Sequence, residues 1–240
     1  GDNRLSVSAF SVSETLNWTL TDWLTANANV GYNTSTATRN QTENAITYYN
    51  YLGDTQVLVD PVQGNSYYKQ TSSRTDFYSV TGFLNAHKTF NEDHDLSLTV
   101  GAQYEFKEYT YFGAKVKDTQ TGLEIVNGSG EITLSGDEDK YQNANMSYFG
   151  RFNYSYKDKY LLELNGRYDG SSKFQPANRW DLFYGASLGW RMKQEAFMQD
   201  IDWLSDLKLR VSYAEMGNQS GIANYDGVQL YDVVAGTGAY

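Results

Sequence analysis

The chain has no cysteine and only two prolines among its 240 residues. Without cysteine there can be no disulfide framework, which fits either a protein that does without one or one that avoids mispairing in an oxidising compartment. Proline removes a donor from a β-ladder, so its scarcity fits long strands. No apolar run approaches the roughly 18 residues that a membrane helix needs, so we expect no such helix.

Chemistry-bearing motifs are also lacking. His87 and His94 are the only histidines and no cysteine accompanies them, which argues against a zinc site. The Asp137/Asp139 and Asp200/Asp202 pairs lack the spacing and the Glu of an EF-hand. There is no nucleophile elbow and no phosphate-binding glycine loop. We therefore predict no catalytic residues, no metal site and no cofactor, and do not expect an enzyme.

Positive charge is scarce as well. Lysine and arginine number 19 against 29 acidic residues, which gives a net charge of −10. Nucleic-acid binding needs a basic face, so this class of partner is not expected. A solvated acidic surface explains the balance more simply than an electrostatic filter does.

Aromatic residues, in contrast, are abundant and regularly placed. They make up 15% of the chain, and from Tyr148 to Tyr156 every even position except Gly150 is aromatic. The odd positions there are mostly polar, as at Arg151. Because a strand turns successive side chains to opposite faces, this pattern predicts a strand with one apolar and one polar face.

The same alternation recurs along the chain. It predicts hairpins at Ser11–Thr36, Thr75–Tyr111 and around Lys157–Lys159, single strands near Leu182–Met192 and Leu207–Tyr213, and a further strand near Gly227–Val234. A short helical turn is expected around Ala196–Trp203.

Connection lengths suggest where this sheet resides. Short turns occur at Thr21–Trp23, Asn91–His94 and Lys157–Lys159, whereas long polar segments lie between the hairpins. Bacterial outer-membrane barrels have short periplasmic turns and long external loops. We therefore predict an all-β fold, a segment of an antiparallel transmembrane β-barrel forming one domain over residues 1–240, with external loops at approximately 33–74, 112–145, 170–178 and 214–226.

Aromatic side chains gather near the short turns. They are Trp18, Trp23, Phe90, Tyr156 and Tyr160. Tyr and Trp are enriched where a membrane meets water, so these residues are candidates for an interfacial girdle in contact with outer-membrane lipid. Packing at hairpin ends in a soluble protein is the alternative.

The region from Tyr148 to Gln219 resembles the SusC/RagA family of TonB-linked outer-membrane transporters. The resemblance is carried, in order, by Tyr148–Leu162, Arg167–Phe174, Asn178–Trp180, Gly189–Arg191, Trp203–Tyr213 and Gly217–Gln219. It implies a large barrel in the bacterial outer membrane, closed by an N-terminal plug and covered by a SusD-like lipoprotein. It also implies import of oligosaccharides or peptides, driven through TonB.

The sequence departs from the whole family pattern in two respects. It contains no TonB box or plug, so TonB would act through an N-terminal part that is missing here. The residues Gly236–Ala239 before Tyr240 do not alternate as a closing strand should. We therefore expect a segment from the middle to late part of the barrel.

Candidate contact residues lie in the first long segment, where Tyr48, Tyr49, Tyr51, Tyr67 and Tyr68 cluster. A tyrosine offers an apolar ring and a polar hydroxyl, which suits a sugar or a protein partner, although self-packing of the loop or contact with the lipoprotein explains the cluster equally well. Charged residues on the polar face are expected to pair across strands or to line a solute path: Glu163, Arg167, Arg191, Lys208 and Arg210.

Two other functions fit parts of the pattern. A small self-contained porin or anchor barrel would need strands that close on themselves, because open edges in lipid leave backbone groups unpaired. A soluble carbohydrate-binding β-sandwich would show the same alternation without a membrane.

Overall fold

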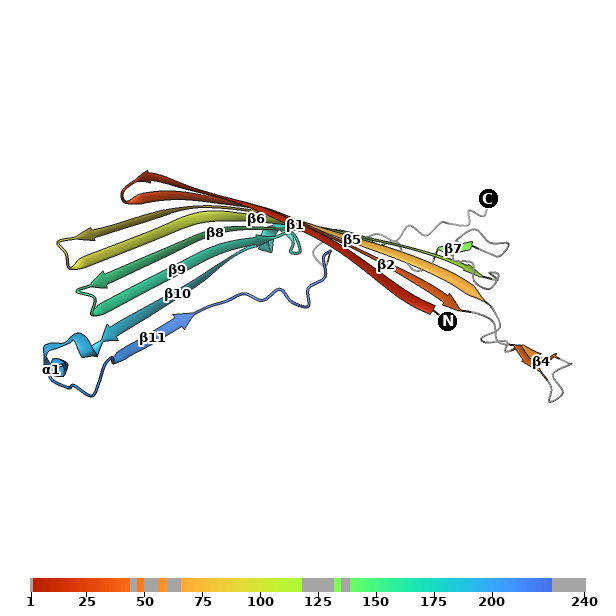
Figure 1. Cartoon of the computed structure of the whole chain (residues 1–240). Coiled ribbons are helices and arrows are strands. Elements are labelled where there is room, and N and C mark those ends of the chain that lie inside the picture. The colour runs from red at the N-terminus through yellow and green to blue at the C-terminus, as the bar shows by residue number, and fades with distance from the viewer. Residues whose placement is uncertain are drawn as a thin grey trace. The chain divides into compact units, whose positions relative to one another are not determined.

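The computed structural model describes residues 2–43, 47–49, 56–59, 66–117, 132–134 and 139–225. Most of these residues form one antiparallel sheet whose strand order is β1-β2-β5-β6-β8-β9-β10-β11, with β7 paired to β6 (Figure 1). A separate two-stranded sheet pairs β3 with β4. Every neighbour along the main order follows in sequence among the long strands, which is the topology of an up-and-down meander.

The element bounds are as follows. The strands are β1 (Asp2–Thr21), β2 (Leu24–Glu43), β3 (Thr47–Tyr49), β4 (Gln56–Val59), β5 (Tyr67–Phe90), β6 (His94–Lys117), β7 (Ile132–Leu134), β8 (Asp139–Tyr156), β9 (Tyr160–Ser171), β10 (Trp180–Arg191) and β11 (Lys208–Ala214). The helical turns are η1 (Pro176–Asn178), η2 (Met192–Gln194) and α1 (Ala196–Gln199). No helix in these described ranges is long and apolar enough to cross a membrane.

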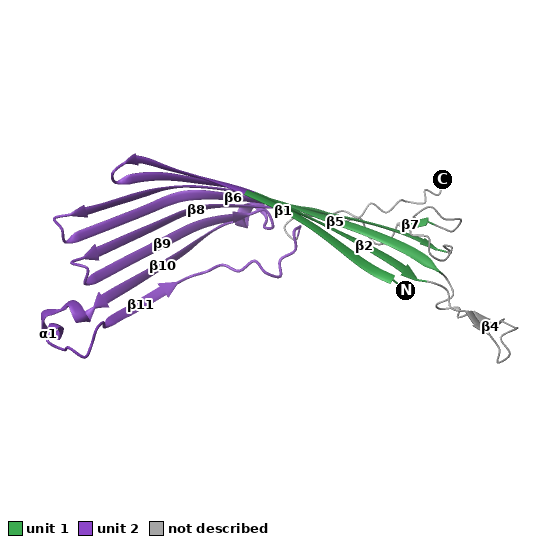
Figure 2. Ribbon diagram, in the orientation of Figure 1, with its two compact units in different colours: residues 1–12, 32–77, 107–142 green, residues 13–31, 78–106, 143–240 purple. Residues whose placement is uncertain are grey.

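The chain divides into two units, each containing parts of several strands (Figure 2). Unit 1 consists of residues 1–12, 32–77 and 107–142. Unit 2 consists of residues 13–31, 78–106 and 143–240 and contains the short turns together with β9, β10 and β11. The long hairpins therefore contribute their turn-proximal halves to unit 2.

Two of the short turns in unit 2 have the backbone twist that hairpins favour. Asn91-Glu92 and Lys157-Asp158 are consecutive residues with φ between 50° and 61°. In the turn between β8 and β9, which is the third turn, the Lys159 amide donates to the Tyr156 carbonyl at 2.9 Å. Two central residues of positive φ are the signature of a type I′ turn, whose twist matches that of the flanking strands. This geometry fixes the register of each hairpin.

The register in unit 2 keeps the alternation continuous from strand to strand. Tyr156 lies opposite Tyr160, Leu162 opposite Leu188, and Leu188 opposite Val211. The apolar face therefore carries even-numbered residues through β10 and odd-numbered residues in β11. A slip of one residue would exchange the two faces, so the pattern determines the pairing.

Glycine permits one close contact inside unit 2. A Cβ atom on Gly101 would lie 2.5 Å from Cζ of Phe149 and 2.6 Å from the Gly82 carbonyl oxygen. The rings of Phe83 and Phe149 meet over this position, with centroids 6.5 Å apart. Only a residue without a side chain leaves room for this packing.

Unit 1 contains the most deeply buried apolar side chains of the described residues: Tyr68, Ala114 and Val116. In unit 2 the buried residues in the described part are glycines and serines, namely Gly31, Gly170, Ser147, Ser171 and Ser187, and the large apolar side chains are mostly exposed. Unit 2 thus has no conventional apolar core in its described part, and its apolar side chains lie at the surface of the sheet.

The strands are longer than the alternation predicted. The first hairpin was predicted to end at Thr36, whereas β2 continues to Glu43, and β5 begins at Tyr67 instead of Thr75. The added residues are polar on both faces, so hydrophobic period alone could not identify them as strand. The predicted helical turn is present as α1, and the further strand predicted near Gly227–Val234 lies outside the described residues.

Candidate functional site

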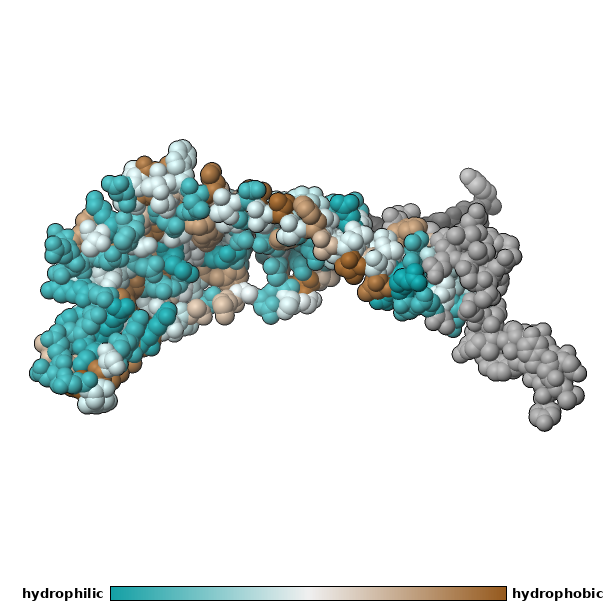
Figure 3. Space-filling model, viewed as in Figure 1, coloured by the Kyte–Doolittle hydropathy of each residue, from teal (hydrophilic) through white to brown (hydrophobic). Residues whose placement is uncertain are grey.

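The sheet in unit 2 presents two chemically different faces. The apolar face exposes a broad set of large side chains, including Leu16, Val30, Leu84, Leu98, Val100, Leu164, Leu182, Leu188, Leu209 and Val211. The opposite, polar face carries Asn, Ser, Thr and charged residues at the alternate positions. Figure 3 shows a largely hydrophilic surface over the visible face of unit 2. An apolar face this extensive needs a nonaqueous surrounding, because monomeric soluble proteins rarely expose such patches.

The five aromatic residues predicted at the short-turn end all lie near the ends of the turn-proximal strands or in a turn. Trp18 in β1 is 63% exposed, Trp23 lies in the first turn, and Phe90 ends β5. Tyr156 and Tyr160 stack across the third turn with ring centroids 6.3 Å apart. Their place in a membrane interface stays a prediction.

A second aromatic cluster lies toward the other ends of β8, β9 and β10. The ring of Trp180 stacks on Tyr168 at 5.0 Å and on Tyr148 at 5.9 Å. Trp180 also lies opposite Gly170, where a Cβ atom would meet the indole at 2.7 Å. Sequence reasoning missed this cluster, although all three residues share the even parity of the apolar face.

On the polar face, side chains form a hydrogen-bonded network across strands. Arg151 donates to Asn165 at 2.9 Å, and Asn165 donates to Glu163 at 2.9 Å. Glu163 and Arg210 lie 3.8 Å apart, while Arg210 donates to Ser187 at 3.2 Å. Each member supports the geometry of the next, so the network holds a fixed polar surface.

Two of the remaining predicted charges, Arg167 and Arg191, have other partners. Arg167 pairs with Asp169 of its own strand at 2.7 Å and donates to Ser147 at 2.8 Å. Arg191 pairs with Asp158 in the third turn. Lys208 lies opposite Arg191 in the register. Pairing across strands, predicted for this set, is therefore confirmed for Glu163 with Arg210.

A groove of about 530 Å³ opens on unit 2 beside this network. Its lining combines aromatic rings with polar side chains: Phe83, Phe149, Phe183, Arg151, Asn165, Arg167, Glu215 and Met216 contribute, together with backbone of the central strands. An apolar lining with a few convergent polar groups is the usual composition of a ligand site. The three phenylalanines interrupt an otherwise polar face, and the alternation gave no reason to single them out.

The segment that follows β11 borders the groove. A Cβ atom on Gly217 would overlap the ring of Phe183, so the ring packs directly on this backbone. Further along, Ser171 donates to the Gln219 side chain at 2.9 Å, Lys173 donates to the Ile222 carbonyl at 3.1 Å, and Asn143 donates to Asn224 at 3.0 Å. These contacts carry the segment from β11 back toward β9 and β8.

At the short-turn end, Glu195 joins two strand residues and one turn residue to the connection between β10 and β11. Its carboxylate accepts from the Tyr160 hydroxyl at 2.7 Å, from Trp190 Nε1 at 3.1 Å and from Lys159 Nζ at 3.1 Å. Tyr160, Trp190 and Lys159 together hold the pKa of Glu195 at about 2, below its usual 4.5, because each donor stabilises the charged form.

Glu195→Gln is therefore expected to lower the midpoint of heat unfolding at pH 7. A depressed carboxylate pKa contributes stability that is present above pH 4.5 and is lost as pH falls through about 2. The difference between the variant and the parent should shrink over that window when the unfolding of the full-length protein in detergent is followed by gel mobility. Glu92→Gln, in the exposed second turn, is the control. If the midpoints of the variant and the parent differ as much at pH 2 as at pH 7, the lowered pKa of Glu195 is contradicted.

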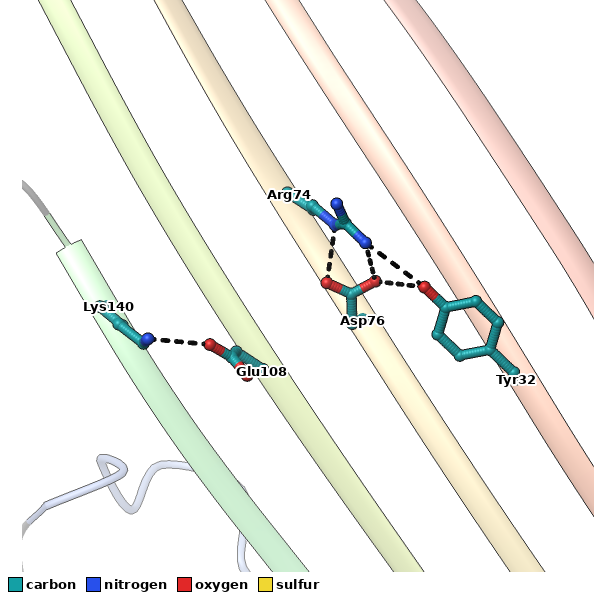
Figure 4. Close-up of polar contacts among 5 residues, drawn as sticks. All are labelled: Tyr32, Arg74, Asp76, Glu108 and Lys140. Atoms are coloured by element: carbon teal, nitrogen blue, oxygen red, sulfur yellow. Dashed lines mark hydrogen bonds and ion pairs between the residues drawn. The ribbon is translucent and has the colours of Figure 1, made fainter.

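In unit 1, even-numbered positions include charged residues, although in unit 2 the even-numbered positions form the apolar face through β10. Arg74 and Asp76 pair at 2.7 Å, and the Tyr32 hydroxyl donates to Asp76 at 2.7 Å (Figure 4). Lys140 pairs with Glu108 at 3.0 Å in the same view. Within β5 the even positions thus change from charged at Arg74 and Asp76 to apolar from Tyr78 to Ala86, and Lys88 follows close to the turn. In β5 the exposed apolar side chains therefore end before Asp76.

The predicted tyrosine cluster is only partly described. Tyr68 is 3% exposed and donates to Asn40 at 3.3 Å, and the Lys115 ammonium lies 3.9 Å from the centroid of the Tyr67 ring. Tyr48 and Tyr49 belong to β3, with side chains outside the described residues, and Tyr51 lies outside them altogether. In the described part of the chain, no group of three or more His, Asp or Glu residues could hold a metal ion.

Comparison with known proteins decides what kind of sheet this is. The family model for the TonB-dependent receptor-like β-barrel matches residues 2–239. The chain belongs to this family. Among its relatives, the TonB-dependent receptor SusC of Bacteroides thetaiotaomicron is 44% identical over 92 residues, which are 38% of this chain and 9% of that protein. The TonB-dependent receptor P26 of Formosa agariphila is 38% identical over 136 residues, 54% of this chain and 13% of that protein.

Solved structures agree. The RagAB peptide transporter matches with a TM-score of 0.74 and 25% identity over 93% of this chain, which spans 24% of that chain. The "open-open" state of the RagAB peptide importer matches equally well, with a TM-score of 0.74. The predicted resemblance to SusC/RagA transporters is confirmed, as is the predicted antiparallel barrel segment.

Family membership also assigns the two faces and the compartment. TonB-dependent receptors are transporters of the bacterial outer membrane, not enzymes, so the apolar face is the one that meets lipid and the polar face is the one that meets the barrel interior. The soluble β-sandwich is thereby excluded. The chain spans between 9% and 24% of the relatives described above.

Proposed function

We propose that this chain forms wall and external loops of a TonB-dependent importer of oligosaccharides or peptides that works with a SusD-like surface lipoprotein. The observation that supports it best is the groove beside Phe149 and Phe183, on the face opposite the lipid-facing side chains. Aromatic rings suit sugar faces and apolar peptide side chains, while Arg151 and Asn165 offer hydrogen bonds. The name of the RagAB peptide importer supports peptides as one of the two cargo classes.

In this proposal the short turns face the periplasm and the longer connections face outward. This orientation rests on the usual pattern of outer-membrane barrels, whose periplasmic turns are short and whose external loops are long. Arg74 and Asp76, at the end of β5 away from its short turn, would then lie beyond the hydrocarbon on the external side. TonB would drive import through parts of the transporter outside this chain.

The tyrosine cluster is proposed as an external contact surface. Tyr48, Tyr49, Tyr51 and Tyr67 would contact cargo or the lipoprotein, whereas Tyr68 is buried and its hydroxyl donates to Asn40. Photo-crosslinking from position 49 in the assembled transporter tests this assignment. Crosslinks to the lipoprotein or cargo are expected, and crosslinks confined to the transporter's own chain would refute it.

Uptake experiments on adjacent residues of β10 test the import function. Phe183→Ala removes a ring from the groove, whereas Leu182→Ala removes a lipid-facing side chain that is 55% exposed. In full-length transporters restored to a deletion strain, we expect Phe183→Ala to weaken uptake of the cargo roughly three- to tenfold, the size of one aromatic contact.

Leu182→Ala should leave uptake unchanged at equal amounts of folded transporter. Growth on oligosaccharide or on peptide as the sole nutrient source identifies the cargo class. If the deletion strain takes up both nutrients normally, the import proposal fails.

A further inference from the structure

The connection between β10 and β11 exposes two aromatic side chains at the short-turn end. Phe197 in α1 is 65% exposed, and Trp203 is 83% exposed. Figure 3 shows hydrophobic residues at the surface around α1, which Figure 1 labels. Exposing apolar area to water costs about 25 cal/mol per Å². A connection of this length with two outward aromatic rings is unlike the tight turns after β5 and β8.

The connection is a fixed structure. Lys193 Nζ donates to the carbonyl of Met198 at 3.0 Å and to that of Ile201 at 2.7 Å, which caps the end of α1. The Met198 amide donates to the Glu195 carbonyl at 2.9 Å. Glu195 in turn holds Tyr160 and Trp190. Phe197 and Trp203 are therefore presented on a braced segment.

These contacts place the connection beside the lipid-facing side of the sheet. Tyr160 and Trp190, which Glu195 binds, both have the parity of the apolar face. Leu207 and Leu209 continue the segment into that face along β11. A groove of about 490 Å³ opens there, lined by Tyr160, Leu162, Leu188, Trp190, Leu209 and Val211 among others. The exposed aromatics are thus continuous with a surface that meets lipid.

The charge of this connection indicates which lipid headgroups it could contact. Asp200, Asp202 and Asp206 are exposed in this connection. Between Met192 and Leu207 the one basic residue is Lys193, whose ammonium group donates to the carbonyls of Met198 and Ile201. Three carboxylates would be repelled by an anionic membrane surface. They complement a zwitterionic headgroup that carries a primary ammonium group, whose N–H donors can reach carboxylate oxygens.

We infer that the connection from Met192 to Leu207 is a membrane-surface anchor for aminophospholipids of the periplasmic leaflet. Phe197 and Trp203 insert among the headgroups, the aspartates meet ammonium groups, and an acyl chain occupies the groove beside Trp190. The inference rests on the proposed orientation of the transporter. Tryptophan favours this zone because its ring is apolar and its N–H can still be hydrated.

The test measures the immersion depth of position 203. In a cysteine-free full-length transporter, Trp203→Cys carries a nitroxide label, and Glu92→Cys in the second turn is the matched control. After reconstitution in phosphatidylethanolamine and phosphatidylcholine vesicles, we expect position 203 to collide several-fold more with oxygen than with a water-soluble nickel chelate. Position 92 should show the reverse. Replacing the phosphatidylethanolamine by phosphatidylglycerol should reduce the immersion of position 203.

Three outcomes would overturn the anchor: equal nickel exposure at both positions, immersion indifferent to the headgroup, or shielding of position 203 from both reagents, which indicates contact with protein. Uptake by the same labelled transporter separates the hypotheses. If the labelled transporter is active but position 203 lies in water, the anchor is refuted and the import proposal stands. If the unmodified transporter shows no uptake, the import proposal is refuted.

Discussion

Leu98→Lys is expected to destabilise the folded barrel by about 2–4 kcal/mol, the cost of a lysine near the middle of a lipid-facing strand. Leu98 lies on the apolar face of β6 and is 44% exposed. It is about midway between the turn after β5 and the aromatic residue Tyr104. An ammonium group there has no water and too short a stem to reach either interface. The midpoint of denaturant unfolding in lipid vesicles measures the change.

Ser97→Lys is the matched control for Leu98→Lys. Ser97 precedes Leu98 and therefore points to the polar face, on the same side of β6 as Asp95. A lysine at that position can remain hydrated and pair with the Asp95 carboxylate. We expect a change within about 0.5 kcal/mol, as for ordinary surface substitutions. Equal losses for the two lysines would contradict the assignment of the two faces.

Gly101→Ala is expected to cost about 1–3 kcal/mol, the usual price of overpacking. The added methyl group would lie 2.6 Å from both the Gly82 carbonyl oxygen and Cβ of Phe83. The Phe149 ring can rotate away, but the backbone oxygen of the paired strand cannot move without disturbing the ladder. Lower resistance to heat or denaturant, with the variant still folded, is the expected readout.

Gly166→Ala provides the comparison for Gly101→Ala. A Cβ atom on Gly166 has no heavy atom within 4 Å, and both glycines lie inside long strands. Alanine there restricts the unfolded chain, so we expect stability to be unchanged or to rise by up to about 1 kcal/mol. A loss at Gly166 as large as that at Gly101 would show that strand glycines matter here for a reason other than space.

Much of unit 2 could be predicted from the sequence because lipid imposes a strict alternation. Tyr148–Tyr156 and Tyr160–Tyr168 have period two and meet at a short turn, so their pairing and faces follow directly. The helical turn at α1 and the edges of β10 and β11 were also predictable to within a few residues. For these elements, the residue pattern of one segment is enough to predict where the element lies in the sequence and which face is apolar.

The polar extensions and the groove could not be predicted in the same way. From Asn33 to Glu43 both faces of β2 are polar, so no alternation distinguishes a strand from a loop. The groove needs Phe83, Phe149 and Phe183 from three strands to come together, and Glu195 needs partners from β9 and β10. Such sites depend on register between strands, which no single segment contains.

Strand β6 has one face in lipid and the other in a water-accessible barrel interior. Nitroxide labels placed singly at positions 97 through 103 of a cysteine-free full-length transporter test this most directly. We predict that oxygen accessibility peaks at 98, 100 and 102, while nickel-chelate accessibility peaks at the odd positions that face the interior. Accessibility to the two reagents that rises and falls together, without a period of two, would contradict the account.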